Sequence, residues 1–226
     1  MRERMTALSL FAHIADHRHP MSLAARLRAR RFAFFGRLLA CVPRPVTILD
    51  VGGTSDSWKR LKYMDDGVKV VLLNVRHGAT DDPRFDSLIG DARDLSAFGN
   101  GSIDVIFSNS VIEHIGDFDD QRKMAMEVRR VAKRYFVQTP NALFPIEPHF
   151  LVPGFQFMPL DLRAFLLTKS RLGWVPRERD RQLAKEIVGS VRLLTAGEMR
   201  ALFPEAAVYR ERFLGMTKSI AAYHGW

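Results

Sequence analysis

The sequence predicts an α/β fold built on a mostly parallel β-sheet with helices on both faces. Short apolar, β-branched runs alternate with helical segments along the chain, which is the pattern of a parallel sheet. The run at 46–51 is followed at once by two glycines, as a buried strand is before a tight turn. Near the end of the chain the sequence predicts a helix and two further strands, so the predicted sheet has seven strands.

The predicted elements follow one another in a regular order. The first five strands are predicted at 46–51, 68–74, 88–91, 103–108 and 135–138. Helices are predicted at 57–64 and 119–133, the second with an apolar face. Thr195 and Glu198 have the spacing of a capping box, so a helix is predicted from there to Leu202. Strands near 207–209 and 219–223 complete the sheet.

One segment interrupts this order. Residues 142–190 are dense in proline and aromatic side chains and too long for a plain connection. We expect a helical and aromatic insertion that caps a substrate site. The predicted organisation is therefore a basic helical segment at 1–44 and one domain at 45–226 that carries the insertion.

The formal net charge of +9 is concentrated near the N-terminus. No acidic residue lies between Asp16 and Asp50, and apolar residues recur there at helical spacing. Six arginines fall in this stretch from residue 26 onward: Arg26, Arg28, Arg30, Arg31, Arg37 and Arg44. We expect an amphipathic helix that packs its apolar stripe on the domain. The alternative is a helix that contacts nucleic acid or, peripherally, an anionic membrane.

The location of the protein is predicted from what the sequence lacks. Cys41 is the single cysteine, which excludes an intramolecular disulfide and a cysteine-based zinc cage. No signal peptide or membrane-spanning segment is predicted. We expect a cytoplasmic protein.

Glycine and polar residues follow the predicted strands, at the edge where open α/β sheets bind ligands. Gly52 and Gly53 follow the first strand and would let the backbone approach a ligand, although such a pair is often only a turn. The second strand ends at Asn74, where an acidic side chain commonly binds ribose hydroxyls. A simple strand-terminating turn is the alternative for Asn74.

The third and fourth strands also end in polar groups. Asp91 can accept a hydrogen bond from an exocyclic amine, with Ala92 beside the ring, although a helix N-cap is the alternative for this aspartate. Ser108 and Asn109 end the fourth strand, and Glu113 with His114 follows shortly after.

Taken together, these segments resemble class I S-adenosylmethionine (SAM)-dependent methyltransferases, in particular the small-molecule enzymes related to those of ubiquinone biosynthesis. The resemblance covers roughly residues 46–141 and is carried by ILDVGG at 48–53, GDA at 90–92 and SIDVIFSNSVIEH at 102–114. It implies a Rossmann-like sheet, SAM as the cofactor and methyl transfer as the activity. The cofactor-binding positions that it implies are Asp50, Gly52, Gly53, Thr54, Asn74, Asp91, Ala92, Ser108 and Asn109.

The first motif departs from the family pattern. The family has glycines at two further positions of this turn, where the chain has Thr54 and Asp56. Asn74 also stands where an acid is usual. These changes indicate either a subfamily variant with a shortened loop or a weakened affinity for SAM.

A methyl acceptor such as a hydroxyl must lose its proton at or before attack, and histidine is the natural base near neutral pH. We expect a small-molecule acceptor, with an oxygen nucleophile favoured. His149 and His114 are the candidate bases, and Glu147 is a candidate to orient His149 or to bind the acceptor. For His114 the alternative is that the Glu-His pair only structures its turn.

The same residues allow three alternative functions: a metal site, a nucleic-acid methyltransferase and a non-catalytic module. Glu113, His114, Glu147 and His149 offer metal-ligand atoms but match no dedicated metal motif, so no metal is expected. A nucleic-acid methyltransferase would show an Asn/Asp-Pro-Pro-aromatic motif where this chain has 108–111, so no nucleic-acid partner is expected. A non-catalytic module of the same fold, which binds a partner through its basic helix, is the remaining alternative.

Overall fold

A computed structural model describes residues 22–59, 65–76 and 82–226 of the chain. Two compact units are present. Within the described residues, the larger unit comprises 36–144 with 190–226, and the smaller comprises 22–35 with 145–189. Each unit is described by itself below.

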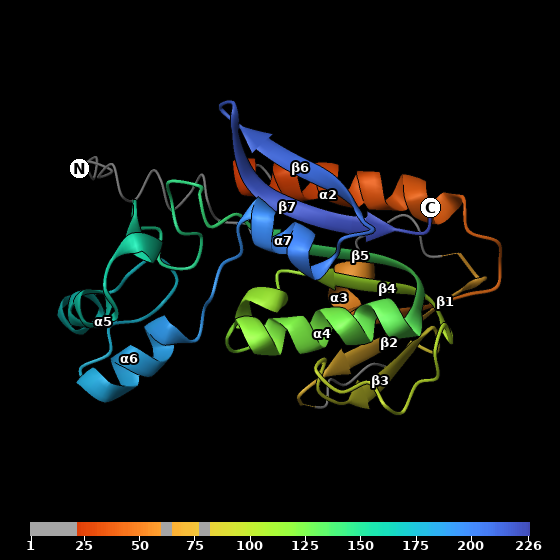
Figure 1. The fold of residues 1–226 in the computed structure, drawn as a ribbon, viewed down its shortest axis with the longest axis horizontal. Coiled ribbons are helices and arrows are strands. Elements are labelled where there is room, and N and C mark those ends of the chain that lie inside the picture. Colours follow the sequence, from red (N-terminus) through yellow and green to blue (C-terminus); the bar gives the residue numbers. More distant parts are fainter. Residues whose placement is uncertain (1–21, 60–64, 77–81) are drawn as a thin grey trace, which may run out of the picture. The chain divides into compact units, whose positions relative to one another are not determined.

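The larger unit is organised around one seven-stranded sheet (Figure 1). Its strands are β1 (Val46–Val51), β2 (Val68–Asn74), β3 (Phe85–Ile89), β4 (Ile103–Asn109), β5 (Ala132–Pro140), β6 (Ala207–Phe213) and β7 (Met216–His224). They lie in the order β3-β2-β1-β4-β5-β7-β6. The first five are parallel, and β7 is antiparallel to both β5 and β6. The predicted seven-stranded, mostly parallel, Rossmann-like sheet is confirmed.

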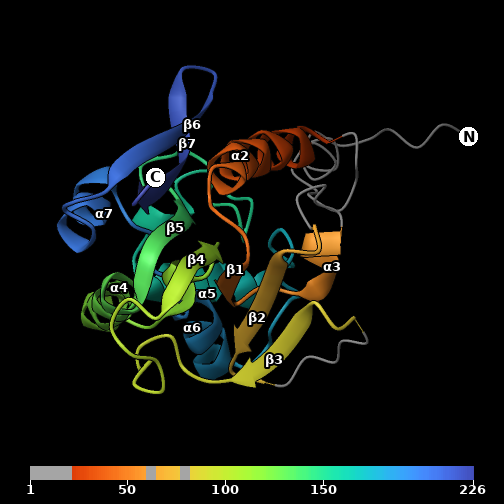
Figure 2. The same ribbon diagram turned by 90° about the vertical axis from the view of Figure 1, so that its right-hand side faces the viewer.

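Helices cover both faces of this sheet. Figure 2 shows α4 (Phe118–Val131) and α7 (Ala196–Leu202) on one side and α3 (Ser55–Lys59) on the other. The main apolar core fills the space between the sheet and the helices α4 and α7, where burial of aliphatic side chains stabilises the unit. Its members from strands and helices include Leu49, Ile106, Val137, Met124, Val128 and Met199.

Local sequence signals explain where these helices begin. The side chain of Asp117 accepts a hydrogen bond from the backbone N–H of Asp120 at 3.0 Å and so caps α4. Thr195 and Glu198 form the predicted capping box at the start of α7, with both reciprocal hydrogen bonds present. Both helices therefore begin where a side chain satisfies a free backbone donor.

Some predicted boundaries were wrong. The third strand spans Phe85–Ile89 and not 88–91, so Asp91 lies in the following loop. β5 begins at Ala132, directly after α4, and is longer than predicted because its ends are fixed by pairing with β4 and β7. The helix predicted at 57–64 begins at Ser55, and its predicted continuation at 60–64 lies outside the described residues.

The segment 142–190 contains helical elements of its own, which lie in the smaller unit. These are the 3₁₀ turn η2 (Phe155–Phe157), α5 (Leu160–Lys169) and α6 (Arg181–Gly189). Ala164 and Leu167 of α5 and Ala184 and Val188 of α6 are buried. The rings of Phe150 and Phe155 lie 4.5 Å apart, so aromatic packing accompanies these helices.

α2 (Leu23–Ala40) is the predicted basic helix. Arg26, Arg30 and Arg37 are exposed and Leu27 and Leu39 are buried, as expected for an amphipathic helix. Arg31 is buried, so the arginines of this helix do not all face solvent. Among the described residues, no helix combines the length and the apolar character needed to cross a membrane.

Candidate active site

The sheet brings several of the predicted site residues to one edge. Asp50 of β1 is in register with Leu72 of β2 and with Phe107 of β4, so the carboxyl ends of these three strands are neighbours. The order reverses between β1 and β4, since β2 and β3 lie on one side and β5 on the other. This is the topological switch point at which open α/β sheets bind ligands.

The turn after β1 requires both of its glycines. Gly52 has a φ of +77°, and a Cβ there would lie 2.5 Å from Cγ2 of Val111. A Cβ on Gly53 would overlap the carboxylate of Asp50. The exposed Thr54 lies at the start of α3, where its Oγ1 is 3.1 Å from the hydroxyl of Ser57. The two glycines therefore let Val111 and the Asp50 carboxylate pack directly against the backbone of the turn, which any other residue would prevent.

Asp50 is buried directly beneath this turn. Its side chain is 2% exposed, and the indole Nε1 of Trp58 donates a hydrogen bond to its Oδ2 at 2.5 Å. Burial raises the pKa of Asp50 to about 7, although the Trp58 hydrogen bond acts in the opposite direction. Near neutral pH the carboxyl group therefore exchanges between its neutral and ionised forms.

Asn74 contacts the same turn from β2. Its Nδ2 donates to the backbone carbonyl of Gly53 at 3.0 Å, so its amide oxygen is the end that can accept from a ribose hydroxyl. A carboxylate has no N–H and could not make this bond. Asn74 therefore does more than end the strand. Its amide group donates the hydrogen bond that holds the Gly53 carbonyl, which an acidic side chain could not do.

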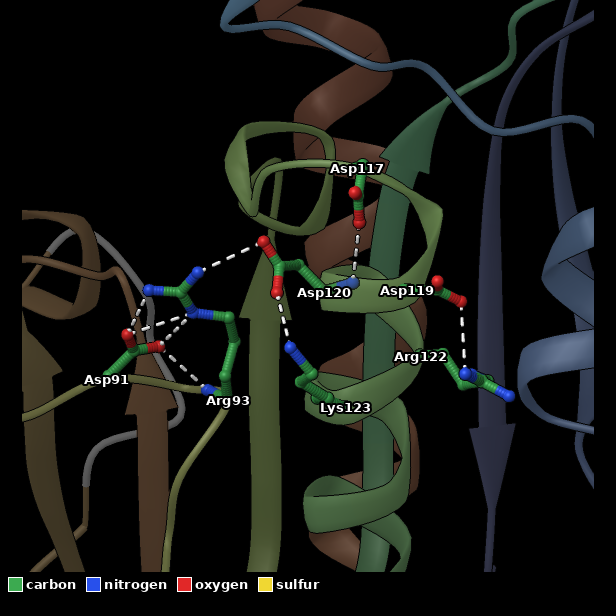
Figure 3. A network of polar contacts seen from close by, with 7 residues as sticks. All are labelled: Asp91, Arg93, Asp117, Asp119, Asp120, Arg122 and Lys123. Atoms are coloured by element: carbon green, nitrogen blue, oxygen red, sulfur yellow. Dashed lines mark hydrogen bonds and ion pairs between the residues drawn. The ribbon is translucent and has the colours of Figure 1, made fainter.

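Asp91 lies in an ion-pair network (Figure 3). Its carboxylate accepts from Nε and NH2 of Arg93, and Arg93 also reaches Oδ2 of Asp120 at 3.1 Å. The Arg93 hydrogen bond holds the pKa of Asp91 below its usual value. The backbone N–H of Arg93 also donates to Asp91 at 2.9 Å, so Asp91 structures a turn and does not cap a helix. Ala92 beside it is buried.

The end of β4 carries buried polar atoms that suggest a ligand. Ser108 is fully buried, and neither its Oγ nor the buried Oδ1 of Asn109 has a hydrogen-bond partner among the described residues. Buried polar atoms are nearly always satisfied, so two orphans at a binding edge call for a ligand or water. Ser110, which follows, has a left-handed φ of +59°, a strained conformation that is enriched at functional sites.

Three residues beside the predicted site were missed from the sequence. Gln138 of β5 is in register with Asn109, is 1% exposed, and accepts a hydrogen bond from Ser110 Oγ at 3.1 Å. Trp58 and Arg93 are the partners of Asp50 and Asp91. Their signal was positional: each lies within a few residues of a strand end that was already singled out.

The Glu-His pair after β4 forms the short turn η1 (Ile112–His114). Glu113 is fully buried and accepts a hydrogen bond from Thr139 Oγ1 at 3.0 Å, while its backbone carbonyl accepts from Arg192 N at 2.7 Å. His114 is exposed. These contacts favour a structural role for the pair, which ties the β4–α4 connection to β5 and to the segment after residue 190.

Glu147 and His149 belong to the smaller unit and contact each other. Oε1 of Glu147 lies 2.6 Å from Nδ1 of His149, and Oε2 accepts from the backbone N–H groups of His149 and Phe150. The Glu147 side chain is 3% exposed. When Nδ1 carries the proton that faces the carboxylate, the lone pair is on Nε2. The arrangement is that of a histidine oriented by an acid.

The residues at the edge of the sheet fit SAM. The buried oxygens of Ser108 and Asn109 suit donors such as the ammonium group of the methionine part of SAM. The amide oxygen of Asn74 suits a ribose hydroxyl. The donor set is therefore compatible with the cofactor.

Comparison with known proteins agrees with this chemistry. Residues 49–135 match the family model described as a methyltransferase domain. No curated protein matches the sequence.

Solved structures share the fold at low sequence identity. A Bordetella parapertussis protein described as a possible exported protein has a TM-score of 0.54 and 16% identity, over 98% of this chain and 80% of that one. A chain of the complex between the Haloferax volcanii Trm112 methyltransferase activator and a methyltransferase has a TM-score of 0.51 and 14% identity, over 94% and 95%. The CurJ carbon methyltransferase has a TM-score of 0.51 and 13% identity, over 82% and 50%.

The fold, and the glycine turn at the edge of its sheet, are those of an α/β enzyme that binds a cofactor with a nucleotide part. The methyltransferase-domain match at residues 49–135 falls on the strands that build this edge, so the chain carries a SAM-dependent methyltransferase domain. Its cofactor is SAM.

Proposed function

We propose that this methyltransferase methylates an oxygen nucleophile of a small molecule, with His149 as the general base. The observation that carries the proposal is the 2.6 Å contact between Nδ1 of His149 and the buried carboxylate of Glu147. A buried acid that fixes one ring nitrogen leaves the other as a proton acceptor of defined orientation.

In this proposal SAM is held at the sheet edge by Asp50, Gly52, Gly53, Thr54, Asn74, Asp91, Ala92, Ser108 and Asn109. It supplies a methyl group on a positively charged sulfur, with a neutral thioether as the leaving group. Nε2 of His149 would take the proton of the acceptor hydroxyl, so that the oxygen could receive the methyl group that SAM would supply. Glu147 stabilises the positive charge that His149 acquires.

The surroundings of His149 support an organic acceptor. Phe150 and Phe155 are buried near it in the chain, and Leu151 has a left-handed φ of +54° just beyond the histidine. Apolar walls with a few fixed polar groups are typical of small-molecule sites.

The test is His149→Ala, measured with a panel of phenol and alcohol acceptors. We expect S-adenosylhomocysteine (SAH) affinity to stay unchanged and the turnover of an oxygen acceptor to fall about a hundredfold, the usual contribution of a general base. Glu147→Gln should give a smaller loss, because the ring keeps a hydrogen-bond partner without the charge. Normal turnover by His149→Ala would exclude His149 as the base.

We further propose a cytoplasmic location, in keeping with Cys41 as the single cysteine. Peripheral contact of α2 with an anionic membrane is proposed on the exposed Arg26, Arg30 and Arg37. Co-sedimentation with phosphatidylserine vesicles tests it, and binding should be lost when these three arginines are replaced by glutamine.

A further inference from the structure

The turn between β1 and α3 is contacted by the side chains of two strand residues, Asp50 and Asn74. Thr54 and Asp56 stand in two positions that are glycine in the family pattern. Gly53 is contacted from one side by the carboxylate of Asp50 and from the other by Nδ2 of Asn74. Its conformation is therefore fixed by neighbours and not by its own flexibility alone.

Trp58 lies behind this arrangement. It is 1% exposed and donates its indole N–H to Oδ2 of Asp50, the same oxygen that a Cβ on Gly53 would meet. Its ring packs edge-on against Phe107 of β4, with centroids 5.4 Å apart and an interplanar angle of 71°. The ring contact locates the indole, and the N–H then locates the carboxylate.

A buried carboxylate needs such a partner. Asp50 is 2% exposed, and among the described residues Trp58 is the side chain that donates to it. The carboxylate lies directly against Gly53, where a Cβ would overlap it, and the indole N–H is the side-chain donor that holds it there. A hydrogen bond to a charged group in such surroundings is worth more than one between neutral groups.

We propose that Trp58 is a positioning residue of the cofactor site, which acts through Asp50 to set the shape of the Gly52–Gly53 turn that receives the methionine end of SAM. The inference rests on the proposed placement of SAM at this turn. It assigns to Trp58 a role that its burial alone does not require, since any large apolar side chain would fill the same space.

The experiment compares SAH affinity, measured by calorimetry, in the full-length chain and its variants. Trp58→Phe keeps most of the ring and removes the donor, so we expect the Kd for SAH to rise about tenfold. Asp50→Ala and the double variant should bind SAH about as weakly as Trp58→Phe, because the two residues act as one unit. If the double variant loses the product of the two single losses, or if Trp58→Phe binds like wild type, the proposal is wrong.

A packing control separates the hydrogen bond from the ring contact. Phe107→Leu removes the edge-on contact and leaves the indole N–H in place. It should lower the melting temperature and leave the Kd for SAH within about twofold of wild type, as expected when no hydrogen bond is lost. A loss of affinity equal to that of Trp58→Phe would show that packing carries the effect and would overturn the proposal.

The pH profile gives a readout that a purely structural role would not move. The indole N–H stabilises the ionised carboxylate, so its removal should shift the pH dependence of SAH affinity to higher pH. A profile identical to that of wild type contradicts the proposal.

Failure of the proposed SAM site and failure of the proposed role of Trp58 give different results. If wild type does not bind SAH, the placement of SAM at this turn fails together with the inference. If Trp58→Phe does not fold, the double variant decides, because it leaves no buried carboxylate without a donor. Affinity equal to that of Asp50→Ala supports the role of Trp58, and a further tenfold loss overturns it.

Discussion

Two loops at the edge of the sheet are held in opposite ways. The Gly52–Gly53 turn is supported from inside, by a buried carboxylate, a buried indole and the amide of Asn74. The Asp91 loop is supported from outside, by Arg93 and its bond to Asp120 on α4 (Figure 3). The side chains of Arg93 and Asp91 are 42% and 40% exposed.

The two loops differ in the kind of interaction that makes them rigid. Hydrogen bonds among buried groups are shielded from salt and fail only when a partner is removed. Ion pairs between exposed groups are weak and are screened by salt. The first loop should therefore respond strongly to small changes of shape or charge, and the second should respond mildly and in a salt-dependent way.

The largest effect is expected from a single added methyl group in the first loop. Gly53→Ala places a Cβ on the Asp50 carboxylate, so the carboxylate must move and its bond to Trp58 is strained. We expect the Kd for SAH to rise about a hundredfold, at the upper end of the cost of overpacking. Gly99→Ala is the matched control, because its new Cβ would lie 3.9 Å from the nearest side-chain atom. Equal affinities for the two variants would show that the turn adapts freely.

A second effect concerns pH and the charge beneath the same loop. The folded protein raises the pKa of Asp50 to about 7, so Asp50 contributes stability at low pH that is lost as the pH rises toward 7. Asp50→Asn keeps an acceptor for Trp58 and removes this titration. Between pH 5 and pH 8, the free energy of unfolding of the variant should gain about 3 kcal/mol relative to wild type.

The measurement for this second effect is urea unfolding of the cofactor-free protein at several pH values. Parallel pH profiles for Asp50→Asn and wild type would show that the carboxyl group is already ionised at low pH. In that case the charge of Asp50 would not distinguish the first loop from the second.

The smallest effect is expected in the second loop. Arg93→Ala removes both ion pairs of the guanidinium and should raise the Kd for SAH about two- to fivefold at low salt, in line with the value of exposed pairs. The effect should shrink in about 1 M NaCl, where screening is short-ranged. Arg122→Ala, which removes the exposed pair with Asp119 on α4, should leave the affinity unchanged. A salt-independent loss in Arg93→Ala would mean that this loop, too, is held from inside.

The sequence predicted the sheet better than the site. Short apolar, β-branched runs indicated the seven strands in their order along the chain, because burial on both faces of a parallel sheet dictates that composition. The ends of β3 and β5 were misplaced, since pairing with neighbouring strands decides where a strand stops. The capping box at Thr195 was predicted correctly because a cap is a local interaction.

Partners that come from other elements were not predictable. Nothing in the residues around Asn74 indicates that its amide would donate to the carbonyl of Gly53, twenty-one positions earlier. The bonds of Arg93 to Asp120 and of Trp58 to Asp50 likewise depend on how the loops fold over the sheet. The choice between the bases His114 and His149 is still a proposal, and Glu113 contacts favour the structural reading for the first.

The bond from Asn74 to Gly53 links two tasks in one side chain. A primary amide has a donor end and an acceptor end, and the protein backbone occupies the donor end. The end that faces the proposed ribose is therefore selected by the fold before any nucleoside arrives. Substitution by aspartate, an acid of the kind that binds ribose hydroxyls in many folds of this type, would supply two acceptors and repel the carbonyl. In this chain the residue that is usual elsewhere would be the damaging one.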